Sequence, residues 1–120
     1  MIKSYLFTGI EKNFFDKSKR KLCSTQIPYV VVPNFPSLGF ITALRFLEWV
    51  NENPKGVISL PTGKTPEHFI KWTKYLLDNW KSSKVQKILK ENGIKFTKKP
   101  DLKGLHFVLV LLDTLIVFRY

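Results

Sequence analysis

The short apolar run Val57-Ile58-Ser59-Leu60 lies between two stretches with helical periodicity, and this arrangement constrains the fold more than any other feature. The run is too short for a stable helix and is mostly apolar, as a strand covered on both faces should be. One helix is predicted before it, over residues 36–50, and another after it, beginning at Pro66. A buried strand between two helices favours a parallel sheet with crossover connections.

The same alternation extends over most of the chain. Tyr29-Val30-Val31-Val32 is predicted to be a strand because it is rich in β-branched residues and ends at Pro33. A third helix is predicted over residues 83–92, with Gly93 at its C-terminal end, and a third strand over residues 105–112. This order of elements indicates an α/β fold in three layers, α/β/α, around a parallel sheet.

Length and charge restrict the class of protein. The chain has 120 residues, enough for one domain, and we interpret residues 1–27 as an irregular, basic N-terminal extension of the folded residues 28–120. Its 20 Lys and Arg against 9 Asp and Glu give a net charge of +11, which favours anionic partners. The charges are dispersed along the sequence, so a nucleic-acid partner is not expected. A basic module that binds RNA or an acidic partner stays open as an alternative.

Cysteine content and hydropathy bear on the location of the protein. Cys23 is the single cysteine, which excludes an internal disulfide and a metal site made only of cysteines. No apolar segment typical of a secretory signal precedes Glu11, so a cytoplasmic location is expected. The most apolar stretch, residues 105–118, is shorter than the roughly 20 residues that span a bilayer, and Asp113 interrupts it. No membrane partner is expected.

The turn Leu60-Pro61-Thr62-Gly63-Lys64-Thr65-Pro66 is predicted to hold an anion. Thr65 suits the N-cap of the following helix, and the proline after it suits the first helical position. Gly63 allows a positive φ and a close approach of the backbone to a ligand. Free amides and the helix dipole favour a bound oxyanion, to which Thr62 offers a hydroxyl and Lys64 a positive charge. An ordinary capped helix after a tight turn would use the same residues.

Two families share features of this turn. Gly63-Lys64-Thr65 matches the end of the P-loop pattern G-x-x-x-x-G-K-[ST], but the first glycine of that pattern is replaced by Ile58. A degenerate P-loop that binds a nucleotide is therefore the weaker alternative. Residues 57–66 resemble the strand and phosphate loop of the glucosamine-6-phosphate deaminase (isomerase) family, in which an apolar strand ends in L-P-T-G-x-T-P before a helix. The related 6-phosphogluconolactonases carry a Gly-Gly-Ser-Thr-Pro variant, which leaves a hydrolase of that type as another alternative.

The resemblance covers residues 28–113 and implies the N-terminal part of a Rossmann-like sugar-phosphate isomerase domain. Complete family enzymes convert an amino sugar phosphate to a ketose phosphate and release ammonia, without a metal or an organic cofactor. By this resemblance Asp113 is the catalytic base that moves the proton between the sugar carbons. The phosphate of glucosamine 6-phosphate is assigned to four residues of the turn: Thr62, Gly63, Lys64 and Thr65.

The resemblance weakens near the end of the chain. Thr114-Leu115 stands where the family has Glu-Tyr after the catalytic aspartate, and the later Gly-rich segment with a catalytic His and Glu has no counterpart. His68 and His106 do not match that segment. We expect His68 to lie on the surface or to support the site from behind, and His106 to have a structural role. These departures predict a truncated family domain with little or no turnover alone. Apolar strands at the edges of an incomplete sheet leave association with a second copy open.

Overall fold

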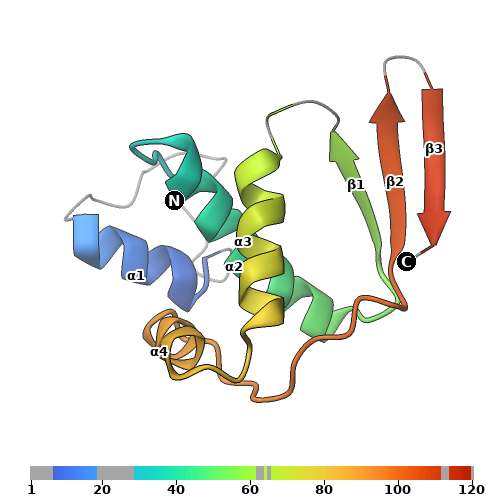
Figure 1. Cartoon of the computed structure of the whole chain (residues 1–120). Helices are drawn as coiled ribbons and strands as arrows, with labels where there is room; N and C mark the ends of the chain where they lie inside the picture. The colour runs from blue at the N-terminus through green and yellow to red at the C-terminus, as the bar shows by residue number, and fades with distance from the viewer. Residues whose placement is uncertain (1–6, 19–28, 62–63, 65, 112–113, 120) are drawn as a thin grey trace.

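The computed structural model describes residues 7–18, 29–61, 64, 66–111 and 114–119. Within these residues the helices form one group and a small sheet lies beside them (Figure 1). In chain order the elements are α1 (Gly9–Ser18), α2 (Phe35–Glu52), β1 (Val57–Pro61), α3 (Glu67–Asp78), α4 (Ser83–Glu91), β2 (His106–Leu111) and β3 (Thr114–Arg119).

The sheet has the strand order β1-β2-β3. β1 and β2 are parallel, with Val57 opposite His106 and Pro61 opposite Val110. β2 and β3 are antiparallel, with His106 opposite Arg119. The predicted α/β class is therefore confirmed in its coarse form, because α3 and α4 connect two parallel strands. β3 was not predicted as a separate, antiparallel strand, since residues 105–118 form one mostly apolar stretch that Asp113 and Thr114 interrupt without a clear turn signal.

α2 forms where the apolar periodicity predicts it. Its N-cap, Asn34, accepts a hydrogen bond from the backbone N–H of Ser37 at 2.9 Å, and Pro36 occupies the first turn. At the other end Asn53 donates from both its backbone N–H and its side chain to the carbonyl of Trp49, at 2.8 and 3.0 Å. Both ends of the helix are thus capped by residues next to the apolar run.

α4 also agrees with the sequence prediction, including its C-terminal glycine. Gly93 has a φ of 75°, the left-handed conformation that glycine adopts without strain. The N–H of Ile94 donates to the carbonyl of Leu89 at 2.9 Å, and that of Gly93 to the carbonyl of Lys90 at 3.1 Å. These two hydrogen bonds form a Schellman motif, which ends the helix at the predicted residue.

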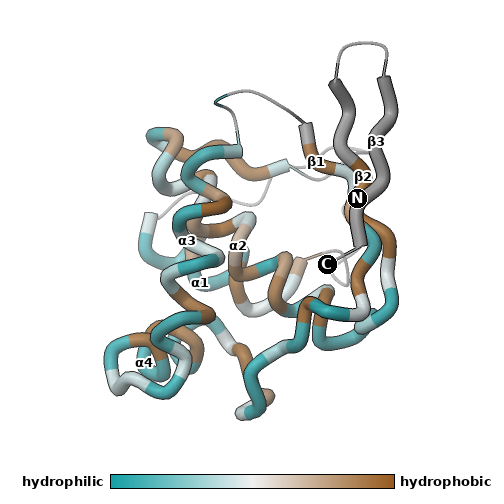
Figure 2. The backbone as a smooth tube through the Cα atoms, turned by 45° about the vertical axis from the view of Figure 1, so that its right-hand side comes forward, coloured by the Kyte–Doolittle hydropathy of each residue, from teal (hydrophilic) through white to brown (hydrophobic). Residues whose placement is uncertain are grey.

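The hydrophobic core lies among the four helices and the segment before β2. Each helix carries both hydrophobic and hydrophilic residues, as expected of helices with one buried face (Figure 2). The largest fully buried side chains of the described residues come from α1, α2, α3, α4 and the residue before β2: Ile10, Leu44, Leu47, Val50, Leu76, Val85 and Leu105.

The interpretation of residues 1–27 as an irregular extension is wrong for residues 9–18, which form α1. Ile10 and Phe15 of this helix are buried. Thr8 and Glu11 form a capping box, in which the Glu11 carboxylate accepts a hydrogen bond from the backbone N–H of Thr8 at 2.9 Å. The N–H of Ile10 donates to the Thr8 hydroxyl at 3.3 Å. This T-x-x-E pattern is present in the sequence and would have located the start of the helix.

Arg45 of α2 links α1 to α2. Its Nε lies 2.7 Å from a Glu11 carboxylate oxygen, and a second guanidinium nitrogen lies 3.2 Å from Glu48. The hydroxyl of Thr8 donates to the same Glu48 oxygen at 2.9 Å. The side chain of Glu11 is only 9% exposed, so its charge depends on these partners rather than on water.

Replacing Arg45 with methionine is expected to lower the free energy of unfolding by about 1–2 kcal/mol, because the nearly buried Glu11 charge loses its main partner. Lys74→Met is the control, since Lys74 pairs with Asp78 in an exposed ion pair. It should change stability by less than about 0.5 kcal/mol. Urea unfolding of both variants at neutral pH makes the comparison. Equal effects would show that the Arg45–Glu11 pair does not link α1 to α2.

Tyr29-Val30-Val31-Val32 does not form the predicted strand, and the sheet begins at β1. Tyr29 and Val31 are 51% and 54% exposed. β-branched residues are stable in a strand only when a neighbouring strand and a packed face are present. A β-branched run alone therefore does not show that a strand forms.

Candidate functional site

The chain leaves β1 and β2 at the same edge of the sheet, because Pro61 lies opposite Val110 in a parallel ladder. In Figure 1 both arrowheads point to this edge, and the connection from β1 leads to the N-terminal end of α3. Ligands of parallel α/β sheets bind beyond the carboxyl ends of strands, where loops enter helices. This edge is therefore the candidate site.

The predicted site residues fall mostly outside the described part of the chain. Lys64 is described and its side chain is exposed. Thr62, Gly63, Thr65 and Asp113 lie outside the described residues, so their roles stay predictions.

α3 begins one residue later than the sequence predicted. Pro66 is the N-cap, and within the described part of the chain no side chain caps this helix end. The backbone N–H of Glu67 donates to the carbonyl of Lys64 at 3.0 Å. One amide of the first turn is thus already used, so an anion at this helix end has fewer free donors than an uncapped helix offers.

Gly39 of α2 brings that helix against the first turn of α3. A Cβ at this position would lie 2.6 Å from the backbone carbon and the Cβ of His68, and 2.7 Å from the backbone nitrogen of Phe69. Such distances are shorter than packed atoms allow, so glycine is required for this close approach. The contact fixes the helix end that borders the candidate site. The sequence pattern gave Gly39 no special role.

The electrostatics of this helix end are set by Glu67 and its neighbours. Lys71 Nζ donates to the Glu67 carboxylate at 2.8 Å. This hydrogen bond and the Lys71 charge lower the pKa of Glu67 below its ordinary value, with a smaller lowering from His68. An ionised glutamate in the first turn also interacts favourably with the helix dipole. Lys64 and Lys71 together outweigh the charge of Glu67, so the described charges here are positive on balance.

Replacing Lys71 with methionine is expected to raise the pKa of Glu67 toward its ordinary value. The lowered pKa in the folded state means that this ion pair stabilises the protein at neutral pH, and that the stabilisation disappears as the pH falls through the folded pKa. NMR titration of the Glu67 side-chain carboxyl measures the shift. Lys74→Met, which removes a lysine three positions along the same helix, should leave the Glu67 titration unchanged.

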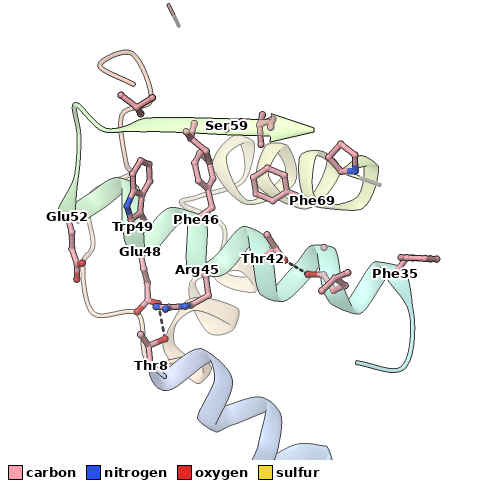
Figure 3. Close-up of a pocket in the computed structure, with 16 residues that line it drawn as sticks. Thr8, Phe35, Thr42, Arg45, Phe46, Glu48, Trp49, Glu52, Ser59 and Phe69 are labelled. Atoms are coloured by element: carbon pink, nitrogen blue, oxygen red, sulfur yellow. Dashed lines mark hydrogen bonds and ion pairs between the residues drawn. The ribbon is translucent and has the colours of Figure 1, made fainter. Parts of the chain in front are cut away.

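A groove with a cavity volume of about 960 Å³ runs from the site edge along α2 and β1. Its part next to β1 is aromatic, since Phe46, Trp49 and Phe69 lie between α2 and this strand (Figure 3). Arg45 and Glu48 lie on the side of α2 nearer α1. The groove supplies an apolar wall beside the candidate anion site. Sequence reasoning missed it, because apolar periodicity shows which face of α2 turns inward but not where β1 leaves space.

The two histidines of the described residues lie at different distances from this edge. His68 is half-buried in the first turn of α3, against Gly39. His106 opens β2, opposite Val57, and a strand rise of about 3.3 Å per residue puts it about 13 Å from the edge. Its Nδ1 is buried without a hydrogen-bond partner among the described residues.

The described part of the chain contains no group of three or more His, Cys, Asp or Glu side chains placed to hold a metal ion. Its helices are also too short or too polar to span a membrane. No family model, curated protein or solved structure matches the chain. The resemblance of residues 57–66 to a phosphate loop therefore rests on the motif itself.

Proposed function

We propose that the chain is a sugar-phosphate-binding domain of the glucosamine-6-phosphate deaminase (isomerase) type, with a three-layer Rossmann-like arrangement. One observation carries the proposal. The L-P-T-G-x-T-P motif follows an apolar strand of a parallel pair and leads directly into a helix, which is the context the motif needs. A cytoplasmic location and chemistry without a metal or organic cofactor belong to the same proposal.

In this function Thr62, Gly63 and Thr65 bind the substrate phosphate through backbone amides and hydroxyl groups, and Lys64 supplies the counter-charge. The exposure of Lys64 and the positive balance of charge at the start of α3 support this assignment. Asp113 acts as the base, and it follows β2 in the sequence, which ends at the same edge as β1.

Little or no turnover is expected from the chain alone. The 120 residues contain no counterpart of the Gly-rich segment that carries the family's catalytic His and Glu. An assay for ammonia release from glucosamine 6-phosphate by the purified chain checks this expectation, and robust turnover would contradict it.

Binding of glucosamine 6-phosphate in a calorimetric titration tests the proposal. Lys64→Ala is expected to weaken binding about tenfold, the effect of losing one charged hydrogen bond. Lys103→Ala is the matched control, because Lys103 is an exposed lysine in the turn that precedes β2, at the other end of the strands. Equal effects of both variants would contradict a phosphate site at the turn. Magnesium-dependent ATP binding that Lys64→Ala removes would favour the P-loop alternative instead.

A further inference from the structure

A second groove lies between α4 and the segment that follows it, away from the candidate sugar-phosphate site. Its cavity volume is about 510 Å³, and residues from 83–90 and 94–97 line it. None of its lining residues is acidic. We call it the basic groove and define it by three exposed lysines and three buried or partly buried apolar residues: Lys87, Lys90, Lys95, Leu89, Ile94 and Phe96.

The positive charge extends beyond the basic groove itself. Lys84, Lys87 and Lys90 are exposed and recur every three residues on the outer side of α4, while Val85 and Leu89 face the core. In the sequence Gly93 separates Lys87 and Lys90 from Lys95, but the structure brings these three lysines to one concave surface.

Acidic groups do little to neutralise this surface. Lys98 and Lys99 are exposed and continue the basic segment. Glu91 is the one acidic residue between residues 79 and 100, and its carboxylate lies 3.5 Å from Lys17 of α1. The surface therefore attracts a ligand with several negative charges.

An aromatic ring is held in place beside these charges. Phe96 lines the basic groove and stacks on Trp80, with the ring centroids 5.9 Å apart and the planes 13° apart. Trp80 Nε1 also donates to the carbonyl of Thr97 at 3.0 Å. Trp80 is buried, so it fixes the position of the segment that presents Phe96. Proteins that bind single-stranded nucleic acid combine an aromatic ring, on which bases stack, with basic side chains that contact the phosphates. Phe96 and the lysines of the basic groove form such a combination.

We propose that the basic groove binds single-stranded nucleic acid, an activity separate from the proposed sugar-phosphate binding. An anionic membrane is the other polyanion to consider, and a helix binds strongly to it when apolar side chains protrude among the lysines. Leu89 and Ile94 are 2% and 8% exposed, so they cannot insert into a bilayer. Among the residues whose burial the structure describes, the exposed large hydrophobic side chains are on other segments: Tyr29, Val31, Phe35, Leu38, Val57 and Ile70.

Fluorescence anisotropy with a labelled oligothymidylate of about 12 nucleotides tests the proposal. The variant Lys87→Glu/Lys90→Glu/Lys95→Glu is expected to bind at least about tenfold more weakly at low salt. Its plot of log affinity against log salt should be shallower by about 2, since each lost phosphate contact contributes about 0.7. The control Lys12→Glu/Lys55→Glu/Lys103→Glu changes the net charge equally at exposed lysines elsewhere and should cost less than about threefold.

Phe96→Leu tests the contribution of base stacking to binding separately from that of charge, because it removes the ring and leaves the lysines unchanged. It should weaken binding about fivefold and leave the salt slope unchanged. If either set of charge reversals lowers the Tm, the same comparison is made with glutamine at the same positions. Three results would each overturn the proposal. They are equal losses of oligonucleotide affinity in the two triple variants, no oligonucleotide binding at about 50 mM salt, and tighter binding to phosphatidylserine vesicles than to the oligonucleotide.

Discussion

Replacing Leu44 with alanine is expected to lower the free energy of unfolding by about 3–4 kcal/mol. Leu44 lies in the middle of α2 and is fully buried in the core that the four helices share. Truncation removes apolar contacts and leaves a cavity, and rigid helices around the site limit how far that cavity can collapse. Domains of this size are stable by only about 5–15 kcal/mol, so the loss is a large fraction of the total.

Ile70→Ala is the matched control, because it removes an aliphatic side chain of the same size from a position that is 51% exposed. It should cost less than about 1 kcal/mol. Urea unfolding followed by circular dichroism measures both variants. Similar losses at Leu44 and Ile70 would contradict the assignment of α2 to the centre of the core.

Replacing Gly39 with valine is expected to lower the free energy of unfolding by about 2–3 kcal/mol. The new side chain would meet the backbone of His68 and Phe69, which cannot move aside as a flexible side chain can. Either α2 or α3 must shift, although valine itself is a somewhat better helix former than glycine. Because the start of α3 borders the candidate site, the same variant should also weaken sugar-phosphate binding.

Thr42→Val introduces the same side chain one turn further along α2, where Thr42 is exposed. It removes the hydrogen bond from the Thr42 hydroxyl to the carbonyl of Leu38, and it should cost less than about 1 kcal/mol. A loss as large as that of Gly39→Val would show that valine in α2, rather than the contact between α2 and α3, causes the destabilisation.

The elements that could be predicted from the sequence are those with both a periodic apolar pattern and capping residues at their ends. Asn34 and Asn53 cap the two ends of α2. Ser82 caps the start of α4, and Gly93 follows its C-cap in the left-handed conformation. β1 could be predicted because it is a short apolar run between two segments with helical periodicity.

The errors have equally specific causes. The prediction for residues 1–27 was based on their basic composition. The capping box at Thr8 and Glu11 is a separate local pattern that predicts the start of α1. Tyr29-Val30-Val31-Val32 has high β propensity, but propensity alone does not supply a neighbouring strand. β3 depends on pairing with β2, a contact that no local pattern in residues 114–119 predicts.

The candidate site was predictable only in part. The motif identified the turn between β1 and α3, and the parallel ladder puts the ends of β1 and β2 at one edge. Neither the close approach at Gly39 nor the aromatic groove along α2 follows from the motif, since both depend on how separate elements pack. Lys64 is the one predicted site residue within the described part of the chain.

The most direct measurement is a ¹⁵N NMR titration of the full chain with glucosamine 6-phosphate, compared with glucosamine and with inorganic phosphate. A phosphate site at the turn predicts saturable shifts of the backbone amides of Lys64, Glu67 and His68 with glucosamine 6-phosphate. Inorganic phosphate should shift a subset of them, and glucosamine none. Shifts confined to α4 and the segment after it, or equal responses to glucosamine with and without its phosphate, would contradict a sugar-phosphate site between β1 and α3.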